Sequence, residues 1–195
     1  MKKTINYKYR ILILLLCIIP LYSYAQHLKF MGVPINGTIN NFQKKLQYKG
    51  FSISKYNKGL SAGVRDFDGY FANKKASVIV FYNTRTKTVY KCRVVFDSYE
   101  SESSAIPDYS YFKELLSDKY NSHSLNSDMV KDSTRAPYSY SWAVMQPPVE
   151  IGSLLLGYIG ISIESYNNLL KYMIWIDYTD STNNELNDKD KINDL

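Results

Sequence analysis

Residues 87–96 read Lys-Thr-Val-Tyr-Lys-Cys-Arg-Val-Val-Phe, and the even positions from 90 to 96 are all apolar or aromatic. Successive side chains of a β-strand point to opposite faces of the sheet. The stretch therefore predicts a strand with a packed face and a solvated face, which is typical of an antiparallel sheet. The packed face would carry Tyr90, Cys92, Val94 and Phe96, and the solvated face Lys87, Lys91 and Arg93. Residues 158–165 alternate in the same way, with Ile at 159, 161 and 163.

Two helices are predicted, each of them before a group of strands. The first lies within residues 35–50, where Thr38 is a suitable N-cap, Gly50 a suitable stop, and the apolar positions 39, 42 and 46 share one face. The second is expected at 107–120, with Asp108 as its cap and an apolar stripe of Phe112, Leu115 and Leu116. Strands are expected at 51–56, 66–73, 77–83 and 87–97, and then, after a long loop at 121–137, at 138–145, 149–156, 158–165 and 170–178.

The order helix, four strands, helix, four strands indicates a duplicated unit. Residues 42–49 and 112–119 share Phe, Leu and Lys at an offset of 70 positions. We therefore predict an α+β fold of two tandem helix-plus-antiparallel-sheet units, a basic unit at 26–100 and an acidic unit at 101–180. Residues 181–195 are polar with little to bury, which predicts a disordered tail.

The tandem arrangement resembles the beta-lactamase-inhibitor-like and BamE-like secreted modules. Residues 30–38, Phe-Met-Gly-Val-Pro-Ile-Asn-Gly-Thr, precede a predicted helix that ends in Lys-Gly-Phe at 49–51. This opening resembles that of small uncharacterised exported proteins of Bacteroides and Prevotella. The resemblance implies an exported protein with a non-catalytic role, and it assigns no functional residue.

Residues 1–25 have the features of a cleaved secretory signal peptide. A basic start is followed by the apolar run 11–22, and Ser23-Tyr24-Ala25 places small residues at the cleavage site. The apolar run is shorter than the ~18 residues that span a bilayer, and no second run of that length follows. The sequence thus predicts export to the periplasm or the cell exterior, with Gln26 as the mature start and no integral membrane segment. Cys92 would be the single remaining cysteine.

Charge is divided unequally along the expected mature chain. Residues 26–96 hold 13 Lys and Arg but two acids, a net +11, whereas residues 97–195 hold seven Lys and Arg and 16 acids, a net −9. The excess predicts a basic face that binds an anionic envelope component or an acidic protein. Alternatively, the basic half docks on the acidic half, or the charges only solvate two surfaces. Candidate binding residues are Lys44, Lys45, Lys49, Lys87, Lys91 and Arg93. The net +2 of the whole mature chain argues against a nucleic-acid partner.

Aromatic residues offer a second candidate surface. Tyr138, Tyr140 and Trp142 alternate with small residues and would share one strand face. Such a ladder could stack on sugar rings or anchor a protein. Alternatively, it is the core face of that strand.

A small secreted hydrolase is the alternative class of function. Residues 59–63, Gly-Leu-Ser-Ala-Gly, match a nucleophile elbow, in which a helix would have to follow Ser61. Cys92 between two cations could be a thiolate, and His123 is the available base for either nucleophile. Alternation instead places Cys92 on the packed face, and residues 64–69 are typical of a turn and strand. We therefore predict a non-catalytic module.

Metal and cofactor sites are not predicted. Two His and one mature Cys provide few zinc ligands. Residues 66–69, Asp-Phe-Asp-Gly, begin like a calcium loop but lack its later acidic positions. No phosphate-binding loop or dinucleotide fingerprint is present, so no cofactor is expected.

Overall fold

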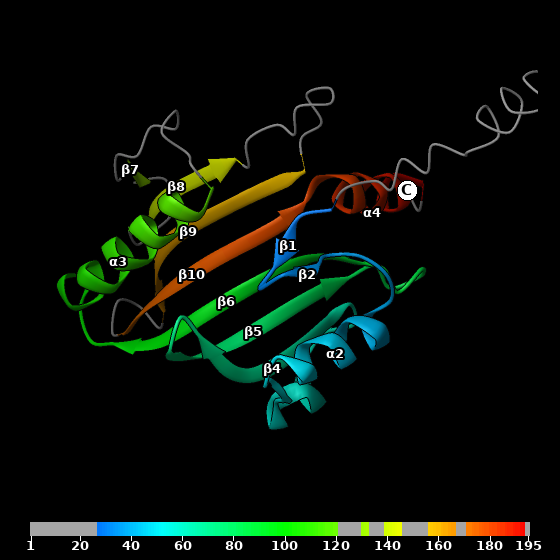
Figure 1. The fold of residues 1–195 in the computed structure, drawn as a ribbon, viewed down its shortest axis with the longest axis horizontal. Helices are drawn as coiled ribbons and strands as arrows, with labels where there is room; N and C mark the ends of the chain where they lie inside the picture. The colour runs from blue at the N-terminus through cyan, green and yellow to red at the C-terminus, as the bar shows by residue number, and fades with distance from the viewer. Residues whose placement is uncertain (1–26, 121–129, 133–138, 146–155, 167–170, 194–195) are drawn as a thin grey trace, which may run out of the picture.

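The computed structural model describes residues 27–120, 130–132, 139–145, 156–166 and 171–193. The fold is α+β, as predicted, and its sheets are antiparallel (Figure 1). Its elements are, in chain order, β1 (Lys29–Phe30), β2 (Val33–Pro34), α2 (Ile39–Tyr48), β3 (Ser52–Ile53), the 3-10 helix η1 (Lys55–Gly59), β4 (Val64–Phe71), β5 (Lys74–Tyr82), β6 (Val89–Tyr99), α3 (Glu102–Tyr120), β7 (Val130–Asp132), β8 (Ser139–Met145), β9 (Gly157–Tyr166), β10 (Lys171–Asp180) and α4 (Ser181–Asn193).

Strands from both halves of the chain form one eight-stranded sheet. Its order is β3-β4-β5-β6-β10-β9-β8-β7, and the halves meet where β6 pairs with β10, for example at Val94 and Ile176. The predicted boundary near residue 100 therefore does not separate two sheets. Counted outward from the β6–β10 pair, both halves follow the same pattern. Each half runs from its last strand in the centre to its first strand at the edge. Duplication of a unit is compatible with this order but stays a prediction.

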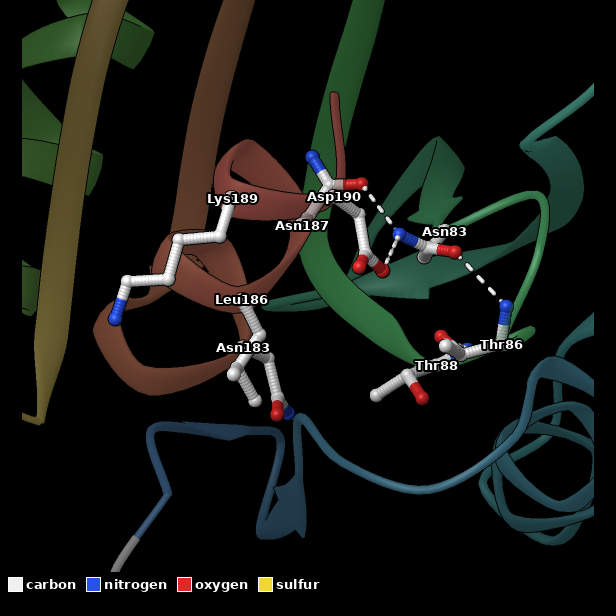
Figure 2. A pocket seen from close by; sticks show the side chains of 8 residues that line it. All are labelled: Asn83, Thr86, Thr88, Asn183, Leu186, Asn187, Lys189 and Asp190. Atoms are coloured by element: carbon white, nitrogen blue, oxygen red, sulfur yellow. Dashed lines mark hydrogen bonds between the residues drawn. The ribbon is translucent and has the colours of Figure 1, made fainter. Parts of the chain in front are cut away.

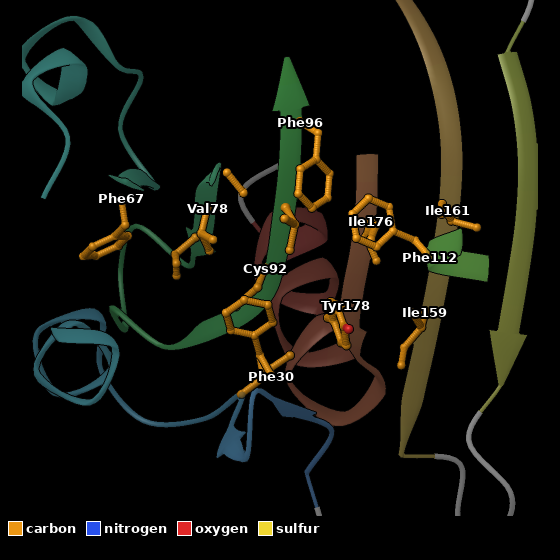
Figure 3. Packing of buried hydrophobic residues seen from close by; sticks show 14 of the residues in the cluster. Phe30, Phe67, Val78, Cys92, Phe96, Phe112, Ile159, Ile161, Ile176 and Tyr178 are labelled. Carbon is orange, nitrogen blue, oxygen red and sulfur yellow. The ribbon is translucent and has the colours of Figure 1, made fainter. Parts of the chain in front are cut away.

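One hydrophobic core lies on a single face of this sheet. Figure 3 shows Cys92 and Phe96 of β6 beside Ile176 and Tyr178 of β10, with Phe30 and Phe112 packed over them. The ring centroids of Phe96 and Phe112 are 4.3 Å apart, which fixes α3 on this face. The hairpin β1–β2 and helix α2 cover the same face, and Phe42 of α2 is fully buried. The opposite face of the sheet, here called the second face, carries Lys91 and Arg93.

Helix α2 forms as its sequence predicts. The Thr38 hydroxyl accepts a hydrogen bond from the Asn41 amide at 3.5 Å and caps the first turn. Gly50 has φ +90°, a left-handed conformation that glycine adopts without steric cost and that ends the helix. The predicted apolar face is confirmed, since Ile39, Phe42 and Leu46 are buried.

Helix α3 begins earlier than predicted, at Glu102. The Ser101 hydroxyl accepts from the Ser104 amide at 3.2 Å, so a serine caps the helix instead of Asp108. Pro107 lies inside α3, and reading it as the helix start was therefore wrong. Of the predicted stripe, Phe112 and Leu116 are buried, but Leu115 is 40% exposed.

Two of the strand predictions need correction. The strand expected at 51–56 is reduced to β3, because η1 begins at Lys55. In β6, the register with β5 shifts at Val89, so that Val89 is buried and Tyr90, predicted in the core, is only half-buried near Phe81. The strand predicted at 149–156 lies, apart from Leu156, outside the described residues, and β7 falls within the predicted loop at 121–137.

The tail predicted to be disordered is instead helix α4 over residues 181–193. Its packed face is polar, with Ser181, Asn183 and Asn187 buried. The Asn183 amide donates to the backbone carbonyls of Ile35 at 2.9 Å and Val89 at 3.1 Å. The prediction was wrong because it assumed that only apolar side chains can be buried. Polar side chains can also be buried when they are hydrogen-bonded.

Candidate binding surface

The outer face of α2 is cationic. Lys44, Lys45 and Tyr48 of α2 are exposed, with Tyr48 at 92%, and Lys49, which caps the end of the helix, is also exposed. We call these four residues the α2 surface. None of the three lysines forms an ion pair with any residue that the structure describes. Residues 27–65 contain no acid at all, so the charge of the α2 surface is not balanced by neighbours in sequence.

Two further cations flank α2. Arg65 of β4 donates to Asn40 at 3.1 Å and to Gln43 at 2.6 Å, which places its guanidinium against the helix. Lys87 was predicted on the solvated face of the strand, but it lies before β6, with φ +62°, and its backbone carbonyl accepts from the Ile39 amide at 2.8 Å at the start of α2. The acid nearest in sequence, Asp66, accepts from Ser77 at 2.6 Å, and it alternates with buried Phe67, which places it on the second face. Cations therefore gather around α2, while the nearest acid in sequence points to the other face of the sheet.

Lys91 and Arg93 do not belong to this surface, although the sequence grouped them with it. They lie on the second face, where both bind Asp177 of β10. Arg93 donates through Nε at 2.6 Å and Nη2 at 2.8 Å, and Lys91 donates through Nζ at 2.8 Å. The Arg93 guanidinium also lies 3.8 Å from the centroid of the Trp175 ring. The predicted single basic face is thus divided between two sides of the sheet.

The Asp177 carboxylate is held in its charged form. Burial by itself raises its pKa, but the hydrogen bond from Arg93 and the charges of Lys91 and Arg93 outweigh burial and lower the pKa below its usual value. The charges of Lys91 and Arg93 are therefore partly neutralised within the protein. This leaves the α2 surface as the better candidate for an outside partner.

Other ion pairs also join the two halves. Lys74 of β5 pairs with Asp108 of α3, and Arg85 of the β5–β6 turn pairs with Asp190 of α4. Asp108 also accepts from the Tyr99 hydroxyl at 2.6 Å. Burial is the largest single influence on Asp108 and raises its pKa, but the hydrogen bonds from Lys74 and Tyr99 and the charge of Lys74 together outweigh it, so the pKa is lowered. Part of the charge division is therefore internal, as the alternative interpretation of the sequence expected.

A small hollow lies between α4 and the β5–β6 turn (Figure 2). Its volume is about 230 Å³, and Asn83, Asn187 and Asp190 form its polar wall. The Asn83 amide donates to Asn187 at 3.3 Å and to Asp190 at 3.0 Å, while its carbonyl oxygen accepts from the backbone of Arg85 and Thr86. These bonds attach α4 to the sheet. These bonds were not expected, because residues 181–195 were predicted to form a disordered tail.

The aromatic ladder is only partly described. Tyr138 lies outside the described residues, and the structure describes only the backbone of β8 at Tyr140 and Trp142. The register pairs Tyr140 with Ile163 and Trp142 with Ile161, two residues that are buried in β9. Binding through this ladder stays a prediction.

The structure describes Ser61 and Cys92, the two nucleophiles considered for hydrolysis. Ser61 is exposed in a turn that leads into β4, so no helix follows it as a nucleophile elbow requires. Cys92 is fully buried, and burial raises the pKa of its thiol well above the usual value, which disfavours a thiolate. His123 lies outside the described residues.

The described residues contain no cluster of three or more His, Cys, Asp or Glu side chains that could hold a metal ion. Among the described helices, none is both long and apolar enough to cross a membrane. Comparison with models of protein families, with curated proteins and with solved structures gave no match to this chain.

Proposed function

We propose that the protein is an exported, non-catalytic module that binds an anionic envelope component or an acidic protein through the α2 surface. The observation that carries the proposal is the contrast between the cations. Lys74, Arg85, Lys91 and Arg93 are tied to acids of the second half, whereas Lys44, Lys45 and Lys49 have no such partner among the described residues.

Export rests on the sequence of residues 1–25, with Gln26 as the mature start. A tandem origin of the fold is supported by the mirrored strand order about β6 and β10. Both statements are part of the proposal. Signal cleavage is checked by N-terminal sequencing of the protein recovered from the culture medium or periplasm.

The hydrolase alternative has weaker support in the structure. It needs an activated nucleophile, and Ser61 lacks the helix of an elbow while Cys92 lacks access to solvent. A binding role needs only an exposed surface with unbalanced charge, which the α2 surface supplies.

The test compares three forms of the mature chain, residues 26–195. The first is the wild type, the second carries Lys44→Glu, Lys45→Glu and Lys49→Glu, and the third is a charge-matched control. The control reverses three exposed lysines elsewhere that form no ion pair among the described residues, namely Lys75, Lys171 and Lys189. Circular dichroism and thermal melting establish that each form is folded.

Binding is measured to two defined polyanions, immobilised heparin and polyglutamate, and by affinity capture from native cell-envelope extract. We expect the wild type and the control to be retained and the α2 variant to elute at much lower salt. Equal retention of the α2 variant and the control would contradict the α2 surface as the binding site. If no form binds a polyanion or captures a specific envelope component, the proposal of an anionic partner fails.

A further inference from the structure

The shape of the α2 surface limits the kind of partner that it fits. Lys44, Lys45 and Tyr48 are exposed residues of α2, a helix that lies over one face of the sheet (Figure 1), and exposed Lys49 follows directly after it. The solvent side of a helix is the outside of a cylinder and is therefore convex. A convex surface does not enclose a small ligand, because ligand pockets are concave. It can lie against a partner that is broad and nearly flat.

Exposed aromatic and aliphatic groups accompany these cations. Tyr48 is 92% exposed, and the segment directly after α2 adds Ile53 at 46% and Tyr56 at 66%. The Lys55 ammonium lies 5.1 Å from the centroid of the Tyr56 ring. Tyrosine has an apolar ring and a polar tip, and lysine extends an apolar stem to a charged end, which suits both residues to a boundary between apolar and aqueous phases.

The combination differs from an ordinary solvated helix face. A surface helix that only meets water usually mixes both signs of charge, but α2 and the segment up to Arg65 contain no acid. Basic residues with aromatic and apolar groups on one exposed side are typical of segments that lie in the interface of an anionic membrane.

We propose that the α2 surface docks on an anionic lipid membrane, with Lys44, Lys45 and Lys49 against phosphate headgroups and Tyr48 inserted at the headgroup level. This inference rests on the proposed function and names its partner. The contribution expected of three lysines near an anionic surface corresponds to about a 100-fold gain in partitioning. An acidic protein would be bound by the same charges, but it does not require the exposed Tyr48.

The experiment measures co-sedimentation of the mature chain with vesicles of phosphatidylcholine alone and of phosphatidylcholine mixed with phosphatidylglycerol. We expect binding only to the anionic vesicles, with loss of binding at high ionic strength, because salt screens the attraction. The Lys44→Glu, Lys45→Glu, Lys49→Glu variant should bind at least about 100-fold more weakly. The Lys75→Glu, Lys171→Glu, Lys189→Glu control should bind like the wild type.

Tyr48 separates a lipid surface from other polyanions. We expect Tyr48→Ser to weaken vesicle binding several-fold without changing retention on heparin. Tyr48→Trp should bind like the wild type and gain a blue-shifted emission component on anionic vesicles. Vesicle binding that is absent, unaffected by the three α2 lysines, or insensitive to Tyr48→Ser overturns the lipid inference. If vesicle binding fails but heparin or polyglutamate binds through the α2 lysines, the proposed function stands without the lipid inference. If vesicles, heparin and polyglutamate all fail to bind, the proposed function and the lipid inference are both contradicted.

Discussion

Helices α2 and α4 attach to the same sheet by opposite means. Helix α2 buries Ile39, Phe42 and Leu46 and exposes its polar residues. Helix α4 buries Ser181, Asn183 and Asn187, while Leu186 is 55% exposed and Ile192 is 67% exposed. One helix is held by burial of apolar surface and the other by hydrogen bonds and ion pairs. The difference shows that a polar segment can be an ordered part of a fold when its side-chain amides donate hydrogen bonds to buried backbone carbonyls.

The largest effect is expected from truncation of the apolar contact of α2. Phe42 is fully buried, so Phe42→Ala should lower the free energy of unfolding by about 4 kcal/mol through lost burial and a cavity. The matched change in α4 is Leu186→Ala, which should stay within about 0.5 kcal/mol because the side chain is exposed. Urea unfolding of both variants gives the two values. A loss of similar size in the two variants would contradict the contrast between the helices.

An intermediate effect is expected at the start of α4. Asp180 is fully buried and accepts from the amides of Leu28 and Asn183, both at 2.9 Å, while His27 lies 3.1 Å from its carboxylate. Asp180→Ala leaves two buried donors without a partner and should cost about 2–3 kcal/mol.

Native-state hydrogen exchange shows where the stability lost in Asp180→Ala is located. We expect protection to fall first in α4 and in residues 27–35, while α2 keeps its protection. The conservative variant Asp180→Asn keeps an acceptor and should lose less. Uniform loss of protection throughout the sheet would contradict this expectation, because it would mean that α4 does not unfold independently of the sheet.

The smallest effect is expected on the second face and depends on pH. Asp177→Asn keeps the shape of the side chain but removes its charge, and should cost about 1–2 kcal/mol at neutral pH. The pKa of Asp177 is lowered in the folded state, so its contribution is fully present above the ordinary carboxyl pKa of about 4 and is lost as the pH falls through the lower folded value. The difference between wild type and variant, followed by urea unfolding, should therefore shrink on acidification below that range. A difference that grows there would contradict the assigned ion pairs.

Elements with a strong apolar period could be predicted from the sequence. The cap at Thr38, the apolar face of α2, and the packed positions Ile159, Ile161 and Ile163 of β9 all follow from local spacing and are confirmed. The spacing of residues within one element does not predict features that depend on pairing with residues distant in the sequence. The register shift at Val89 removes Tyr90 from the core, and it arises from pairing with β5, which the spacing within β6 does not record.

The candidate site shows the same limit. Exposure of Lys44 and Lys45 follows from helical spacing, because the buried positions of α2 define its packed face, whereas Lys49 is exposed because the helix ends at Tyr48. The position of Lys91 and Arg93 on the second face was also predicted, but their partner was not. Asp177 lies 84 residues after Arg93 in the chain, and only the pairing of β6 with β10 brings the two together. A count of charges by half could suggest such pairs but could not assign them.

The position of β10 in the sheet has a consequence for the order in which the chain can fold. β10 is the last strand in the described sequence, yet it lies in the middle of the sheet and pairs with β6 on one side and β9 on the other. Until residues 171–180 have joined the sheet, the strands of the two halves have no direct hydrogen-bonded contact, and the core beneath Ile174, Ile176 and Tyr178 stays open. A truncated chain that lacks this strand would leave the facing edges of β6 and β9 with unpaired backbone N–H and C=O groups, which are templates for pairing with another chain.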